Sequence, residues 1–115
     1  MTVEVSELEA APMLLRQDRG THGGIVHLTL NRPNAFNSLS SGLMRLLQVE
    51  IDAIASDPAA RVVIIEGAGR GFCAGHDLKE VTSLETVSAR RALMAQCCEL
   101  MLAIVHCPKP VTAKV

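Results

Sequence analysis

The sequence predicts an α/β fold with a parallel sheet, and three segments carry this prediction. Residues 61–67 (RVVIIEG) are a short apolar run, rich in β-branched residues and bounded by turn residues. Such a run is typical of a strand that is covered on both faces, as in a parallel sheet. Residues 41–57 and residues 85–106 instead space their apolar side chains at helical intervals. Because helical segments flank the buried strand on both sides, we expect strands and helices to alternate.

The N-terminal third predicts a lead-in followed by a hairpin. Residues 1–12 are acidic and small, and we expect them to be flexible. Residues 13–18 and 25–31, separated by the turn sequence GTHGG, form two strand patterns. Apolar and more polar residues alternate in the second strand, which predicts one buried face made of Val26, Leu28 and Leu30.

A turn and an amphipathic helix follow the hairpin. Residues 31–40 (NRPNAFNSLS) are rich in turn formers, and Pro33 disfavours helix at the residue before it. Ser40 is a suitable N-cap for the helix, which Asp57-Pro58 should end. The helical spacing predicts a buried face that contains Leu43, Leu46, Leu47, Ile51, Ile54 and Ala55.

The C-terminal third predicts a short helix, a long helix and a strand. Asp77 and Glu80 have capping-box spacing, and Thr82 and Glu85 repeat this spacing before the long helix at about 85–106. Residues 111–115 (VTAKV) begin a further strand after the breaker sequence HCPKP. We expect the long helix to bury Met94, Cys97, Cys98, Met101, Leu102 and Val105.

Composition excludes several classes of protein. A net charge of −1, with two Phe and no Tyr or Trp, argues against a nucleic-acid-binding protein, which needs a basic face or aromatic stacking surfaces. No segment approaches the length of a membrane span. The N-terminal segment is acidic, unlike a signal or transit peptide. Adjacent cysteines on one helix do not suggest a disulfide framework, so we expect a reducing, cytoplasmic location.

The glycine-rich loop GRGFCAGHD at 69–77 permits four interpretations. Gly69-x-Gly71-x-x-Ala74 fits a dinucleotide fingerprint, but the following helix opens too late for that motif. Cys73-x-x-His76 has the spacing of a zinc half-site, although no convergent second pair is evident, so we expect no metal. A Cys73 nucleophile lacks an orienting third group. A backbone N–H after the turn at Gly75, belonging to His76, could instead stabilise an oxyanion.

Three blocks together resemble the enoyl-CoA hydratase/isomerase, or crotonase, family. They are GIVHLTLNRPNAFNSLS, ARVVIIEGAGRGFCAGHDLKEV and HCPKPVTAKV, and they occur in the family's order and approximate spacing over residues 13–115. The resemblance implies a crotonase-type ββα spiral. Because family members are more than twice as long, we expect residues 13–115 to be the N-terminal part of such an acyl-CoA-binding domain, truncated before its second half.

The resemblance also implies a site. In the family, the first N–H of the oxyanion hole belongs to the position of His76, where a small residue is common. Phe36 likewise stands where Leu is more usual. The second N–H and the acid/base carboxylates of hydratases lie beyond the segment that resembles residues 109–115. The positions that bind coenzyme A match Asn34, Ala35, Phe36, Ala74, Gly75, His76, Asp77 and Leu78.

The implied function is binding of an acyl-CoA thioester and stabilisation of its enolate, for hydration of a 2-enoyl-CoA or isomerisation of its double bond. No cofactor is expected beyond the coenzyme A of the substrate, and family members form trimers or hexamers. A non-catalytic relative, a thioester hydrolase, an inactive fragment and a nicotinamide-binding module stay open as alternatives.

Overall fold

The protein is described from a computed structural model, which covers residues 11–115 with defined positions. Its centre is a four-stranded sheet in the order β1-β2-β3-β4. β1 and β2 form the expected antiparallel hairpin, whereas β2 with β3 and β3 with β4 are parallel. The expected lead-in at 1–12 lies almost wholly outside the described residues. The strands are β1 (Leu14–Arg19), β2 (Ile25–Leu30), β3 (Val62–Gly67) and β4 (Val111–Lys114).

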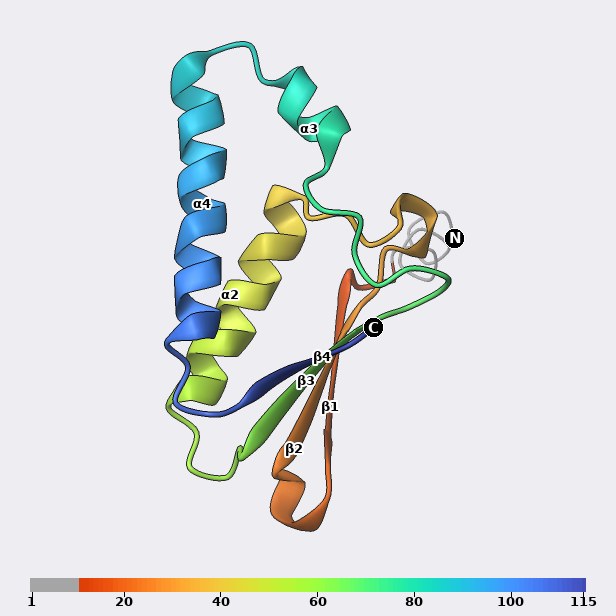
Figure 1. The fold of residues 1–115 in the computed structure, drawn as a ribbon, viewed down its shortest axis with the longest axis vertical. Helices are drawn as coiled ribbons and strands as arrows, with labels where there is room; N and C mark the ends of the chain where they lie inside the picture. The colour runs from red at the N-terminus through yellow and green to blue at the C-terminus, as the bar shows by residue number, and fades with distance from the viewer. Residues whose placement is uncertain (1–10) are drawn as a thin grey trace, which may run out of the picture.

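Helices connect the parallel strands, and α2 and α4 run side by side on one side of the sheet, whereas α3 lies beyond its end (Figure 1). α2 (Ser41–Ala55) joins β2 to β3, and α3 (Leu78–Ser83) with α4 (Val87–Val105) joins β3 to β4. Two short 3-10 turns, η1 (Thr21–Gly23) and η2 (Pro33–Ala35), lie at the ends of β2. The alternating α/β order expected from the sequence is confirmed.

One core lies between the sheet and the helices. The apolar face of β2 enters it as predicted, since Val26, Leu28 and Leu30 are at most 2% exposed. β3 is covered on one face only within residues 11–115: Val63 is fully buried, but Ile64 on the opposite face is half-buried. Among the described residues, the expected cover on both faces is therefore not found, because α2 and α4 lie on the same side of the sheet (Figure 1).

α2 begins as the sequence predicts. The Ser40 hydroxyl accepts a hydrogen bond from the N–H of Leu43 at 3.2 Å, which caps the helix. The buried face of α2 matches the expected face at Leu43, Leu47, Ile51 and Ile54. Leu46 is 39% exposed and Ala55 is half-buried, whereas Met44, which was not expected inside, is fully buried.

The predicted buried face of α4 is confirmed only at Cys97 and is otherwise wrong by about one residue. Leu93 and Leu100 are its buried residues, and Cys97 and Ile104 pack beside them. Met94, Met101, Leu102 and Val105, which were expected inside, are between 39% and 74% exposed, and Cys98 is exposed. α4 is apolar on most of its circumference, so spacing alone does not select a face.

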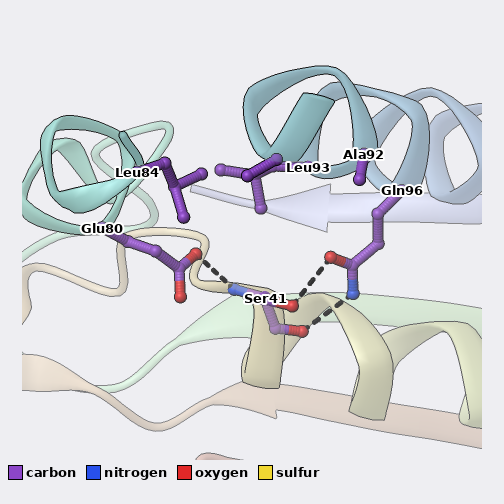
Figure 2. Close-up of a pocket in the computed structure, with 7 residues that line it drawn as sticks. Ser41, Glu80, Leu84, Ala92, Leu93 and Gln96 are labelled. Carbon is purple, nitrogen blue, oxygen red and sulfur yellow. Dashed lines mark hydrogen bonds between the residues drawn. The ribbon is translucent and has the colours of Figure 1, made fainter. Parts of the chain in front are cut away.

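A hydrogen-bonded pair fixes the rotation of α4. The Gln96 amide donates to the Ser41 carbonyl oxygen at 2.9 Å, and its oxygen accepts from the Ser41 hydroxyl at 2.9 Å (Figure 2). The helix also starts later than expected, at Val87. Its N-cap is Thr86, whose hydroxyl accepts from the N–H of Ala89, rather than Thr82 with Glu85.

Candidate functional site

Two loops that follow neighbouring strands meet at one end of the sheet. Residues 31–40 connect β2 to α2, and residues 68–77 connect β3 to α3. The N–H of Ala74 donates to the Phe36 carbonyl oxygen at 3.0 Å. A short parallel bridge then pairs Leu39 with His76. The fold thus places the sequence-predicted segments 34–36 and 74–78 beside each other.

The bridge leaves the backbone N–H of His76 free. The N–H of Leu39 donates to the Gly75 oxygen at 2.7 Å, and the N–H of Asp77 donates to the Leu39 oxygen at 3.0 Å. In an extended segment, successive N–H groups point to opposite sides, so the N–H of His76 points away from Leu39. Within residues 11–115, no acceptor is paired with it.

The surroundings of this N–H are open to solvent. Ala74, Gly75 and Leu78 are exposed, as are Asn34 and Phe36 in the facing loop. The Phe36 and Leu78 side chains are 58% and 72% exposed, which is unusual for large apolar residues. On the His76 ring, Nδ1 is buried without a hydrogen-bond partner among the described residues. The arrangement offers an apolar surface beside one unpaired backbone donor.

Gly75 has a backbone conformation that disfavours other residues. Its φ is +94°, and a Cβ placed there would meet no atom within 4 Å. We therefore expect Gly75→Ala to destabilise the protein by about 1–2 kcal/mol through backbone strain alone. Urea unfolding measures this cost. Gly71→Ala is the control, because its Cβ would make only an ordinary contact, 3.8 Å from the Phe36 ring; an equal loss in both variants would contradict the assignment of strain.

Asn37 holds the start of the glycine-rich loop, a role that sequence reasoning missed. Its side chain is fully buried, and its φ of +56° is left-handed. The amide donates to the carbonyl oxygens of Ala68 and Gly71, both at 2.9 Å. Its oxygen accepts from the N–H of Arg32 at 2.8 Å. One side chain thus joins both loops of the site.

Asp77 holds the end of the same loop. One carboxylate oxygen accepts from the N–H groups of Lys79 and Glu80, which confirms the predicted cap of α3. The other oxygen lies 3.1 Å from Nη2 of Arg32. Glu80 does not return the bond as a capping box requires. Its carboxylate instead accepts from the N–H of Ser41 at 2.7 Å, because the N–H of Asp77 is already paired with Leu39.

The pKa of Asp77 should make stability depend on pH. Hydrogen bonding from the N–H of Glu80, followed by the Arg32 side chain, lowers this pKa below its ordinary value of 3.8. The ionised form therefore stabilises the fold above about pH 4, and this contribution is lost as pH falls through the folded-state pKa. We expect the difference in unfolding free energy between wild type and Asp77→Asn to shrink between pH 6 and about pH 3 in urea titrations. A constant difference would contradict this.

A separate hollow of about 300 Å³ lies where α3 meets the start of α2 and α4 (Figure 2). Glu80 and Gln96 both hydrogen-bond to Ser41 at its floor. Leu84 and Leu93 line it with apolar surface. The hollow contains none of the sequence-predicted site residues, and its polar groups satisfy one another. We interpret it as a structural contact between the three helices, which helps to hold the loop before α3 in place.

The other chemical interpretations of the loop find no support in its geometry. Cys73 packs half-buried against the core. No three His, Cys, Asp or Glu side chains within residues 11–115 converge as a metal site would require. The four cysteines are all free. Over the same residues, no helix combines the length and the apolar character needed to cross a bilayer.

Comparison with known proteins identifies the family. The family model for enoyl-CoA hydratase/isomerase matches residues 25–115. The chain therefore belongs to the enoyl-CoA hydratase/isomerase family. A crystal structure of an enoyl-CoA hydratase from Mycobacterium smegmatis superposes with a TM-score of 0.86 and 42% identity, over 91% of this chain and 40% of that one. The crotonase-type fold predicted from the sequence is confirmed.

Curated relatives from animals carry two kinds of name. "Enoyl-CoA hydratase domain-containing protein 3, mitochondrial" of Danio rerio is 39% identical over 81% of this chain and 32% of its own length. The mitochondrial 3-hydroxyisobutyryl-CoA hydrolase of Xenopus laevis is 40% identical over 75% of this chain and 23% of its own length. The chain thus spans about a third or less of these relatives. One name refers to an enoyl-CoA hydratase domain and the other to a 3-hydroxyisobutyryl-CoA hydrolase.

Proposed function

We propose that this chain binds an acyl-CoA thioester and donates the N–H of His76 to the thioester carbonyl oxygen. The observation that carries the proposal is the unpaired N–H between two hydrogen-bonded neighbours, Gly75 and Asp77. The segments Asn34–Phe36 and Ala74–Leu78 lie around it, and their exposed residues supply the surface for the CoA part of the ligand. These exposed residues are Asn34, Phe36, Ala74, Gly75 and Leu78.

The chemical role of this N–H is to stabilise developing negative charge. When a thioester loses an α-proton, negative charge moves onto its carbonyl oxygen and an enolate forms. The same happens when a 2-enoyl thioester gains a nucleophile at its β-carbon. A fixed backbone donor stabilises that charge without reorganising, and one such donor is typically worth about 3–4 kcal/mol. In the family, a second donor and the acid/base carboxylates follow the segment that resembles residues 109–115. We therefore propose that residues 1–115 bind the thioester but do not turn it over.

In a complete protein of this family, the site would serve hydration of a 2-enoyl-CoA, a lyase reaction of fatty acid metabolism, or isomerisation of its double bond. Thioester hydrolysis is the second candidate, and the 3-hydroxyisobutyryl-CoA hydrolase relative favours it specifically. A non-catalytic acyl-CoA-binding role is the third. Hydration, isomerisation and hydrolysis would all use the same oxyanion donor, so the N–H of His76 does not choose between these reactions.

The remaining proposals concern the setting of the protein. Coenzyme A arrives as part of the substrate, so no separate cofactor is needed. Assembly into a trimer, or a hexamer made of two trimers, follows the family pattern. Free cysteines suit a reducing cytoplasm, whereas the Danio rerio relative is mitochondrial by name. Fractionation of cells that express the native protein tests the cytoplasmic placement.

The experiment measures binding and turnover with the same chain. We expect calorimetry to detect butyryl-CoA binding that weakens about fivefold in Gly75→Ala, the equivalent of one ordinary hydrogen bond, but not in Gly71→Ala. We expect no hydration of crotonyl-CoA and no hydrolysis of 3-hydroxyisobutyryl-CoA above the level of Gly75→Pro. Absence of binding would overturn the proposed ligand. Turnover above that control would overturn the proposed inactivity of residues 1–115.

A further inference from the structure

We propose that Arg32 and Asp77 form a positioning pair that sets the direction of the His76 N–H. This inference rests on the proposed function, because it concerns the donor that would meet the thioester oxygen. It assigns Arg32, in the loop that follows β2, a role in a site that is otherwise built from the segments 34–36 and 74–78.

The first observation is that Arg32 is committed within the protein. Its Nη2 lies 3.1 Å from a carboxylate oxygen of Asp77, and its Nη1 donates to the Ser38 carbonyl oxygen at 2.6 Å. The two side chains of the pair are only 21% and 16% exposed. A planar guanidinium that makes two such bonds in a partly buried site holds both partners in fixed relative positions.

The second observation is that Asp77 is held from three directions. Its side chain accepts from the N–H groups at the start of α3, and its own N–H donates to Leu39. Arg32 completes the set. The plane of the peptide that joins His76 to Asp77 is therefore fixed on the Asp77 side.

The third observation is that the peptide carrying the His76 N–H is hydrogen-bonded to the peptide that Arg32 binds. The His76 N–H and the Gly75 oxygen belong to one planar peptide, and this oxygen accepts from the N–H of Leu39 at 2.7 Å. The Leu39 N–H in turn shares its peptide with the Ser38 oxygen to which Arg32 donates. Arg32 and Asp77 therefore hold both sides of the short bridge that sets the direction of the His76 N–H.

The chain offers a matched control pair. Arg16 and Asp18 also form an ion pair, with a distance of 2.8 Å, but both lie on β1 and outside the two loops. Asp77→Asn keeps a side-chain oxygen that can cap α3 while removing the charge that faces Arg32. Asp18→Asn makes the same change in the control pair. The comparison therefore separates the general effect of losing an ion pair from the specific effect of losing the Arg32–Asp77 pair.

The first measurement needs no ligand. Residual dipolar couplings report the direction of each backbone N–H in the full 115-residue chain. We expect the coupling of His76 to change in Asp77→Asn and in Arg32→Gln, and to keep its wild-type value in Asp18→Asn. Arg32→Lys should restore it only partly, because one ammonium cannot reproduce both bonds of the guanidinium. A His76 coupling that is unchanged in both Asp77→Asn and Arg32→Gln would overturn the proposal.

The second measurement uses two ligands that differ by one oxygen atom. Butyryl-CoA has a thioester carbonyl, whereas S-butyl-CoA is a thioether without one. We expect wild type to bind butyryl-CoA about fivefold more tightly, the value of one hydrogen bond. In Asp77→Asn this ratio should fall towards one, because the thioester oxygen loses its aligned donor while both ligands keep the same CoA part. An unchanged ratio, or an equal loss for both ligands, would contradict a positioning role.

The two measurements separate the two claims. If wild type binds neither ligand while the His76 coupling still changes in the variants, the proposed function fails and the positioning pair stands. If wild type prefers butyryl-CoA but neither the coupling nor the ratio responds to Asp77→Asn, the proposed function stands and the positioning pair fails.

Discussion

Asn37→Ala is expected to destabilise the protein by about 3–4 kcal/mol. This figure is the summed cost of leaving several polar groups without hydrogen-bond partners in a low-dielectric site. The variant removes two hydrogen bonds to Ala68 and Gly71 and one from the N–H of Arg32. The Asn37 side chain is fully buried, so water does not replace these bonds in place. Alanine also tolerates the φ of +56° less well than asparagine. For a domain of this size, such a loss is a large part of the total stability.

Urea unfolding, followed by far-UV circular dichroism, measures the effect of Asn37→Ala. Asn34→Ala is the matched control, because Asn34 lies in the same loop but is exposed; its unfolding free energy should stay within about 0.5 kcal/mol of wild type. If Asn37→Ala cost no more than Asn34→Ala, the two loops would not depend on this side chain.

Leu100→Ala is expected to cost about 3 kcal/mol, within the range for buried leucines that are truncated to alanine. Leu100 lies on α4, and its side chain is fully buried in the core. Its neighbour Met101 is 41% exposed, so Met101→Ala should cost less than about 1 kcal/mol. The pair of variants therefore tests which face of α4 packs inwards.

The same unfolding assay distinguishes the two possible faces of α4. A larger cost for Met101→Ala than for Leu100→Ala would restore the face expected from the sequence and contradict the packing described above. A third variant, Gln96→Ala, should weaken the fold by about 1–2 kcal/mol, because it removes both hydrogen bonds to Ser41. That loss would support Gln96 as the residue that fixes the rotation of α4.

Local signals in the sequence predicted the elements of the fold well. Ser40 and Asp77 are both helix caps as expected, because capping depends on the residue itself and on N–H groups two or three positions ahead. The strand at 61–67 and the hairpin before it were also correct, since alternation and β-branched runs act within one segment. The role of His76 as an oxyanion donor follows from similar local reasoning and from the resemblance to the family, and it stays a prediction.

Features that depend on distant partners were not predictable. The inward face of α4 is fixed by Ser41, which lies 55 residues before Gln96 in the chain. Asn37 resembled any other turn residue, and its role depends on carbonyl groups more than 30 residues away. The spacing of Asp77 and Glu80 predicts a capping box at α3, yet the Glu80 carboxylate accepts from the N–H of Ser41 and so caps α2. No periodicity or spacing rule reports such contacts.

The most direct test of an oxyanion donor in this chain is the amide proton resonance of His76 during titration with butyryl-CoA and, separately, with S-butyl-CoA. A hydrogen bond to the thioester oxygen should move this resonance downfield with butyryl-CoA only, whereas resonances from residues 34–36 should move with both ligands. If His76 responds equally to the ligand that lacks the oxygen, or to neither, its N–H is not the donor.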